Sequence, residues 1–199
     1  MLLNKESAEW PGDTPFQFQI SWSKEQSGSV NVGQITTSTH IGTHIDAPFH
    51  FDNEGLKVHQ LPLENYILEA VVVDMRGKSG VSRDILRNVQ VGTAKAVLFK
   101  TSAWQNRSEF PEEIPLFNVD VVQWMIENNV VLFGVDLPSV DAITSKELPM
   151  HHALGEAGRY ILEGIVLDNI QEAIYKLIAL PLKIEGADGS PVRAVLIEE

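Results

Sequence analysis

STHIGTHIDAPFHF, residues 38–51, holds three of the six histidines of the chain and one aspartate within fourteen residues. Glycine, proline and β-branched residues separate His40, His44, Asp46 and His50, so a helix is not expected here. In an extended chain His44 and Asp46 point to the same side. A bend at Gly42, which lies between His40 and His44, would bring His40 to the same centre. The stretch is either a polar loop rich in histidine or half of a metal site.

The bulk properties of the chain limit what such a site can contain. Its 199 residues predict one domain, residues 1–199, long enough to bury about 70% of its unfolded surface. The formal charge of −12 argues against nucleic acid or an anionic membrane as a partner, because like charges repel. Cysteine is absent, so a metal would be held by His, Asp and Glu. With no signal-peptide core in MLLNKESAEWPGD and no run long enough to span a bilayer, we expect a cytoplasmic protein.

The spacing of apolar residues predicts a mixed α/β, strand-rich fold. FQFQISWS (16–23) and part of GSVNVGQITT (28–37) alternate apolar and polar residues on either side of KEQSG, which predicts a β-hairpin. Buried strands are expected where short β-branched runs occur, at 66–75, 94–101, 130–136, 176–184 and 192–198.

Helices are expected between these strands. Ser82 precedes RDILRNV and is typical of the cap of a short helix, and Asn118 leads VDVVQWMIENN, in which apolar residues recur four apart. A third helix is expected to begin near Thr144 or Ser145, with Pro149 marking either a break or a fresh first turn.

A second group of candidate ligands lies over a hundred residues after the first, in MHHALGEAGRYILEGIVLD (150–168). His151 and His152 belong to the third expected helix, and Glu163 lies in the apolar run YILEGIVL, which predicts a strand. A carboxylate buried there needs a cation or a hydrogen-bond partner, whereas on an edge strand it would face solvent. Glycines allow the chain to reverse and return Glu163 beside one histidine, but the sequence does not decide which histidine faces inward.

Three other polar residues are weaker candidates for a site. Asp136 and Asp141 in GVDLPSVD follow a buried strand, where α/β proteins often place functional groups, but capping of a turn explains them equally well. Ser190 in DGSPV lacks the GxSxG elbow, so a serine hydrolase is not expected.

HIGTHIDAPFH (40–50) resembles the HxGTHxDxPxH signature of the cyclase family of metal-dependent hydrolases. The similarity covers nearly the whole chain and is closest to the arylformamidase (kynurenine formamidase) branch of that family. The histidine signature is specific for the family, and the other segments discriminate less sharply. Those segments are WPGDTPF (10–16), SWSKEQSGSVNVG (21–33), GVDLPSVD (134–141), HH (151–152), ILE (161–163) and ADGSPVRAV (187–195).

The resemblance implies a site for two divalent metal ions, with Zn²⁺ preferred at both positions and Mn²⁺ as the alternative. His40, His44 and Asp46 match the ligands of the first ion, and Asp46 also reaches the second. His151 matches the histidine of the second ion, and Glu163 matches a carboxylate shared by both.

The resemblance also implies the remaining parts of an enzyme. His50 matches the residue that donates and accepts protons, and Trp10 matches a residue that contacts the substrate. The implied fold is a swivelling β/β/α arrangement, and the implied assembly is a homodimer or larger homo-oligomer. Family members usually carry a strand before the tryptophan, which is expected to be short or missing here because nine residues precede Trp10. Lys100 and Trp104 also depart from the family pattern, in a segment expected to shape the pocket.

The implied activity is hydrolysis of N-formyl-L-kynurenine to L-kynurenine and formate. A metal-bound hydroxide would attack the formyl carbon, and His50 would deliver a proton to the departing nitrogen. One alternative is a hydrolase of the same family that opens a cyclic amide such as isatin, with the same ligands and a different pocket. A second is a metal-stabilised binding protein without turnover, which is disfavoured because His50 is present although neither metal needs it.

Overall fold

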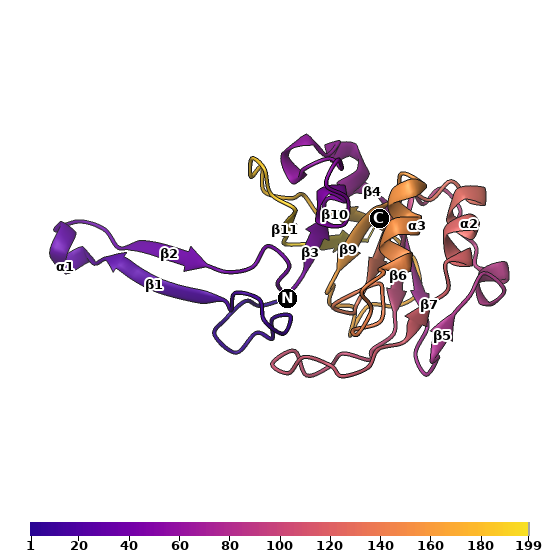
Figure 1. Ribbon diagram of the computed structural model, residues 1–199, viewed down its shortest axis with the longest axis horizontal. Coiled ribbons are helices and arrows are strands. Elements are labelled where there is room, and N and C mark those ends of the chain that lie inside the picture. Colours follow the sequence, from indigo (N-terminus) through magenta and orange to yellow (C-terminus); the bar gives the residue numbers. More distant parts are fainter. Residues whose placement is uncertain (199) are drawn as a thin grey trace.

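The computed structural model describes residues 1–198, and a mixed eight-stranded sheet forms its centre (Figure 1). The strand order is β11-β3-β9-β8-β6-β4-β10-β12. The inner neighbours β9, β8, β6 and β4 run parallel, and the outer pairs are antiparallel. The strands are β3 (His44–Asp46), β4 (Ile67–Asp74), β6 (Ala96–Lys100), β8 (Leu132–Val135), β9 (Tyr160–Glu163), β10 (Ile174–Ile178), β11 (Gly189–Pro191) and β12 (Val195–Ile197).

Two hydrophobic cores cover the two faces of this sheet, because successive side chains of a strand point in opposite directions. In β6, Val97 and Phe99 belong to one core, and Ala96 and Leu98 belong to the other. The first core includes residues of two helices, α2 (Asp120–Glu127) and α3 (Pro149–Glu156). The central strands β6 and β8, which are buried along their whole length, are therefore nearly continuous apolar runs, as expected where a sheet is covered on both faces.

Short elements connect the larger ones. They are β5 (Gly80–Val81) and β7 (Leu116–Phe117), which pair in parallel, and the 3-10 turns η1 (Pro48–His50), η2 (Val58–Gln60), η3 (Leu63–Tyr66) and η4 (Ile85–Asn88). The helix expected after Ser82 is only the 3-10 turn η4, preceded by Asp84 rather than by a serine cap. The expectation of a capped helix there was wrong, because the carbonyl of Ser82, not its side chain, accepts the hydrogen bond of Ile85.

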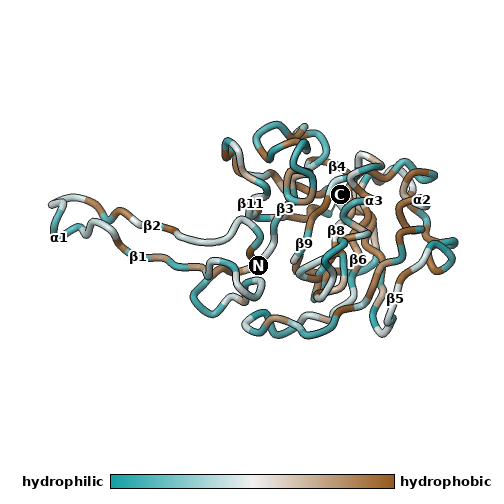
Figure 2. Tube along the Cα trace, in the orientation of Figure 1, coloured by the Kyte–Doolittle hydropathy of each residue, from teal (hydrophilic) through white to brown (hydrophobic). Residues whose placement is uncertain are grey.

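A long β-hairpin extends away from the rest of the chain (Figure 1). It consists of β1 (Gln17–Trp22) and β2 (Val32–Thr36), joined by the single-turn helix α1 (Lys24–Ser27), and all residues of both strands are exposed. Phe18, Ile20 and Trp22 alternate with polar residues, and Figure 2 shows the resulting changes of hydropathy along β1. We call this hairpin, residues 17–36, the arm.

The structure confirms the strand-rich mixed α/β fold. The hairpin and the five further strands expected from the sequence all form, although their bounds differ by a few residues. The expectation of burial was wrong for the last of them, because β12 is an edge strand in which Val195 and Ile197 are exposed. The third helix starts at Pro149, so the proline marks a first helical turn. The first strand of the described chain, β1, begins after Trp10. Within residues 1–198, no helix is both long enough and apolar enough to cross a membrane.

Candidate metal centre

Strand β3 places His44 and Asp46 side by side in the interior of the protein. Both residues are 2% exposed. The Nδ1 of His44 lies 3.0 Å from the carbonyl oxygen of Gly42. Donation of the Nδ1 proton to that carbonyl fixes the tautomer and leaves Nε2 free to accept. This Nε2 lies 3.4 Å from Asp46 Oδ1, so the histidine and the carboxylate face one point.

Strand β9 brings Glu163 to the same point. The register of β3 and β9 pairs His44 directly with Glu163, and His44 Nε2 lies 3.3 Å from Glu163 Oε2. The other oxygen of Glu163 accepts the backbone N–H of Val140 at 2.8 Å. Gly164 follows with a φ of +62°, and a Cβ there would lie 2.0 Å from the carbonyl oxygen of Gly42. Only glycine allows this close approach of the two segments.

Helix α3 supplies the inward-facing histidine. His151 is 3% exposed and His152 is exposed, so the structure distinguishes the two adjacent histidines. Asp141 Oδ2 lies 2.7 Å from His151 Nδ1, and the carboxylate of Asp141 also accepts the backbone N–H groups of Met150 and His151. The opposite nitrogen of His151, Nε2, therefore points to Asp46 Oδ2 at 3.4 Å.

Asp141 thus both caps the start of α3 and orients His151 through its Nδ1 proton. A carboxylate behind a histidine in this way is a common arrangement at metal sites. Asp136 is not among the potential metal ligands of this centre, and its carboxylate accepts the backbone N–H groups of Thr101 and Ser102. It therefore holds the segment that directly follows β6.

The five side chains form two sets of potential metal ligands that share Asp46. The donor atoms of each set lie within 4.8 Å of one another, and the sets are His40–His44–Asp46 and Asp46–His151–Glu163. Asp46 Oδ2 is buried without a hydrogen-bond partner, an arrangement that costs free energy unless a cation satisfies the oxygen. Buried imidazole and carboxylate groups are the donors that zinc and related divalent ions take, so the residues fit such ions.

The carboxylates dominate the electrostatics of this centre. Burial alone would lower the pKa of His44, but hydrogen bonds to Asp46 and Glu163 overcome burial and raise the pKa to about 10. His40 and His151 respond in the same way, with pKa values of about 9 and about 10. The carboxylates thus attract positive charge strongly, whether it comes from protons or from metal ions.

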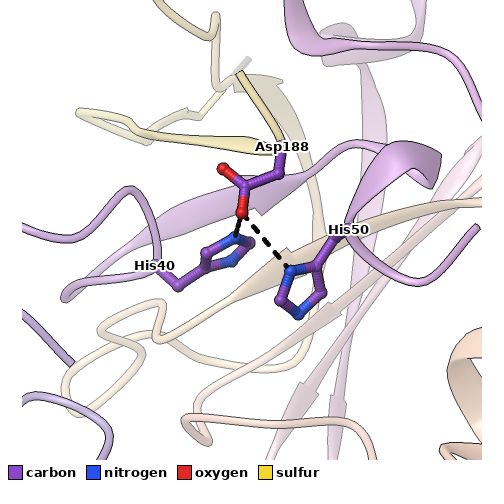
Figure 3. Close-up of side chains that lie close together, drawn as sticks. All are labelled: His40, His50 and Asp188. Carbon is purple, nitrogen blue, oxygen red and sulfur yellow. Dashed lines mark hydrogen bonds and ion pairs between the residues drawn. The ribbon is translucent and has the colours of Figure 1, made fainter. Parts of the chain in front are cut away.

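His50 lies beside this centre but outside the two sets that share Asp46. Its ring packs against that of His40 with centroids 3.9 Å apart, and its side chain is 32% exposed. A third cluster joins both histidines to Asp188, which approaches from the C-terminal part of the chain (Figure 3). Sequence reasoning missed Asp188, because an Asp-Gly pair before a short strand is also typical of an ordinary turn.

A cavity of about 340 Å³ opens onto the centre, and His40, His44, His50, His151 and Glu163 line part of it. Its aromatic wall comes from other segments: Trp10 packs edge-to-face on Phe110 with centroids 5.0 Å apart, and Trp104 also lines the cavity. Two further charged residues, Asp13 and Lys146, also line the cavity. Lys100, by contrast, is buried, and its Nζ donates to the carbonyl oxygens of Asp168 and Ile170.

Comparison with known proteins agrees with this geometry. The model of the Cyclase family, described as "Putative cyclase", matches residues 3–142. A kynurenine formamidase of Bacillus cereus is 48% identical over 194 residues, which cover 98% of this chain and 93% of the relative. A kynurenine formamidase of Geobacillus thermodenitrificans is 50% identical over 194 residues, with the same coverage of both chains.

Solved structures share the fold. A potential metal-dependent hydrolase with cyclase activity aligns with a TM-score of 0.83 at 23% identity, over 98% of this chain and 94% of the other. Isatin hydrolase A from Ralstonia solanacearum aligns with a TM-score of 0.80 at 25% identity, over 100% of this chain and 90% of the other. The chain belongs to the cyclase family, and within it to the group of bacterial relatives named kynurenine formamidase.

Proposed function

We propose that the protein is a metal-dependent amide hydrolase that converts N-formyl-L-kynurenine to L-kynurenine and formate. Relatives that share about half of its residues over nearly the full length bear the name of that activity. The observation that carries the proposal is the pair of ligand sets joined by Asp46, which opens into a ligand-sized cavity with His50 in its wall.

Two divalent ions are proposed, with Zn²⁺ preferred and Mn²⁺ as the alternative. His40, His44 and Asp46 would hold the first ion, and Asp46, His151 and Glu163 would hold the second. The short distance from His44 Nε2 to Glu163 Oε2 supports a role for Glu163 toward both ions. When bound, such ions polarise a carbonyl and lower the pKa of water toward neutrality.

His50 is the proposed proton carrier. Hydrolysis adds water oxygen to the formyl carbon and breaks the bond from that carbon to the aryl nitrogen. The nitrogen leaves poorly as an anion, so it must receive a proton as the bond breaks. The imidazole of His50 lies in the cavity wall, is partly exposed and does not belong to the ligand sets that share Asp46. It can therefore take a proton from the attacking water and pass it to the nitrogen.

The lining of the cavity favours a substrate with an aromatic ring and an amino-acid side chain. Trp10 and Phe110 offer aromatic surface to the ring. Lys146 and Asp13 carry opposite charges in the same cavity, and the side chain of N-formylkynurenine carries a carboxylate and an ammonium group. Isatin has neither charge. The alternative substrate, a cyclic amide, is kept because isatin hydrolase A shares the fold and 25% of its aligned residues.

Steady-state kinetics on zinc-loaded and manganese-loaded protein test the proposal directly. We expect hydrolysis of N-formylkynurenine with a kcat/KM at least about 10³-fold above that for isatin, within the range of selectivity that matched polar contacts provide. A preference for isatin would select the alternative, and turnover of neither compound would refute the proposed activity. Elemental analysis should approach two ions per chain, and one ion that Glu163→Ala leaves in place would refute the binuclear centre.

His50→Ala separates proton transfer from metal binding. The variant should keep its metal and lose about 10²- to 10⁴-fold in kcat, the usual contribution of a general acid–base group, with a much smaller change in KM. A formanilide with a more activated leaving group should recover part of the lost rate. Loss of metal in His50→Ala would make the residue a ligand, and an unchanged kcat would remove it from the mechanism.

We also propose a homodimer or larger homo-oligomer, in which the arm packs on a second copy of the chain. Phe18 and Ile20 lie on one face of β1, across from Ile35 and Gly33 of β2, and Phe18, Ile20 and Ile35 are 59%, 48% and 63% exposed. A two-stranded hairpin is marginally stable alone and gains stability when such a face is covered. Light scattering should find an oligomer that Phe18→Ser/Ile20→Ser dissociates, whereas Gln19→Ser, on the opposite face, should leave it intact. A monomeric wild type would refute this assembly.

The cytoplasm is the compartment we propose. Fractionation of cells that express the protein at its natural level tests this location, and recovery from the medium or the membrane fraction would refute it.

A further inference from the structure

One carboxylate outside the proposed ligand sets faces two of the functional histidines. Asp188 Oδ2 lies 3.1 Å from His40 Nε2 and 3.7 Å from His50 Nδ1 (Figure 3). The other oxygen, Oδ1, accepts the hydroxyl proton of Thr39 at 2.7 Å. One oxygen is therefore anchored by a neutral donor, and the second is directed at both imidazoles.

The backbone around Asp188 is fixed by the same strand pairing that places the metal ligands. Its carbonyl oxygen accepts the N–H of Ala47 at 2.8 Å, and the following residue, Gly189, pairs with Asp46 across β11 and β3. The carbonyl oxygen of Ala187 accepts the N–H of Val58 at 2.9 Å. Asp188 is thus held in register with the motif that carries the histidines, although it lies 148 residues from His40 in the sequence.

The contacts of the two imidazoles indicate which nitrogen each of them directs to Asp188. Nδ1 of His40 lies 2.8 Å from Asp46 Oδ1, on the side of the ligand sets, which leaves Nε2 to donate its proton to Asp188. His50 presents Nδ1 to the same oxygen, which leaves its Nε2 as the nitrogen available to a substrate. The distance of 3.7 Å exceeds that of a hydrogen bond, and catalytic hydrogen bonds that are long in a ligand-free structure commonly tighten in the substrate complex.

We propose that Asp188 is a positioning residue that ties the metal ligand His40 to the proton carrier His50 through one carboxylate oxygen. It holds the imidazole of His50 in the Nδ1–H tautomer, with Nε2 ready to accept a proton. It also orients His40 from the side opposite to the metal, as carboxylates behind metal-bound histidines do. This inference rests on the proposed function, because His50 has a proton to carry only if the protein is a hydrolase.

The competing interpretation makes Asp188 a ligand itself. His40, His50 and Asp188 present donor atoms within 4.8 Å of one another, which would suit a further ion. The two interpretations differ in the number of ions bound and in the tautomer of His50. If Asp188 is a ligand, loss of its carboxylate should remove one ion. If it is a positioning residue, both ions should remain and the ring of His50 should no longer be held in one tautomer.

The central variant is Asp188→Asn, which keeps the shape of the side chain and removes its charge. At saturating zinc we expect kcat for N-formylkynurenine to fall about 10- to 100-fold, the usual effect of losing such an outer carboxylate, with KM changed less than about twofold. In a His50→Ala background the same substitution should cost less than about threefold, because residues that act through one another are not additive. Asp84→Asn, on the exposed turn before η4, is the matched control and should behave as wild type.

Two further measurements do not depend on turnover. The ¹⁵N chemical shifts of the His50 ring, assigned with His50→Gln among only six histidines, should report the Nδ1–H tautomer in the wild type and a mixture in Asp188→Asn. Zinc affinity by chelator competition should weaken about 10- to 100-fold, with the number of ions per chain unchanged. Thr39→Val should shift the tautomer in the same direction as Asp188→Asn, and Thr39→Ser, which keeps the hydroxyl, should not.

Three results would overturn the inference: a wild-type tautomer in Asp188→Asn, an undiminished kcat in that variant, or the loss of one ion per chain. If the wild type does not hydrolyse N-formylkynurenine, the proposed function fails. The tautomer and the zinc affinity would then still show whether Asp188 positions the two histidines.

Discussion

Gly189→Ala perturbs the centre by a distance that follows from the structure. A Cβ at position 189 would lie 2.7 Å from Cε1 and 3.0 Å from Nε2 of His40, whereas ordinary contact requires at least 3.4 Å. The ring would therefore have to move by about 0.7 Å, the difference between 3.4 and 2.7 Å. Misplacement of a catalytic group by about 1 Å can cost about 10²-fold in rate, so we expect kcat/KM to fall about 10- to 100-fold.

The assay combines kinetics on N-formylkynurenine with zinc affinity by chelator competition, because a displaced ligand should weaken both. Gly80→Ala is the matched control: its Cβ would meet nothing nearer than the carbonyl oxygen of Leu116, at 3.5 Å. Neither glycine has a positive φ, so the backbone conformation allows alanine at both positions. At position 189 the Cβ would also lie 3.0 Å from the carbonyl oxygen of Ile45, which must shift by a few tenths of an ångström. Circular dichroism would establish that both variants fold. Wild-type zinc affinity and kcat/KM in folded Gly189→Ala would refute the reasoning that the position of the His40 ring is critical.

Three further predictions follow from the geometry of the centre. His151→Ala should lower the metal content of the protein and His152→Ala should not, because only the first is buried beside Asp46; equal losses by elemental analysis would contradict this. Lys146→Ala should raise KM for N-formylkynurenine about 10-fold or more, as expected for the loss of a charge-assisted contact in the cavity. KM for formanilide should not change, because formanilide lacks the charged side chain. An equal rise in KM for both substrates would contradict this role of Lys146. In chelator-treated protein, the pKa values of His40, His44 and His151 are raised from 6.5, the value in the unfolded chain, to between about 9 and about 10. Protonation of these histidines therefore stabilises the folded state fully below pH 6.5, and this stabilisation is lost as the pH rises through the folded-state pKa values. The melting temperature of the metal-free protein should therefore fall over that range, and addition of zinc at pH 7 should release protons into a weak buffer; a flat profile without proton release would contradict this.

The sequence predicted the parts of the fold that depend on local pattern. Alternation in FQFQISW predicted the arm, and continuous β-branched runs predicted the central strands, because side-chain period and burial are local signals. The strand at 189–191 was missed, since Gly-Ser-Pro has no β-branched residue and pairs only because β3 lies beside it. Tertiary context, not intrinsic propensity, makes it a strand.

The candidate site was predictable to the extent that its residues are close in sequence or match the family signature. His44 and Asp46 could be placed together from the two-residue period of a strand. The choice between His151 and His152 needed the structure, because helix α3 turns only one of them toward Asp46. Asp188 could not be found at all, since its relation to His40 arises from the pairing of strands that lie far apart in the chain.

The position of β3 in the sheet has a consequence for how the protein is made. Its two partners are β9 and β11, so Asp46 pairs with Ile161 and with Gly189. A ribosome that has finished the histidine motif must add more than a hundred further residues before either partner exists. Domains that depend on such distant pairings gather their contacts late, after synthesis has progressed far along the chain. The whole set of proposed donors would therefore come together only after β9 has been synthesised and has paired with β3.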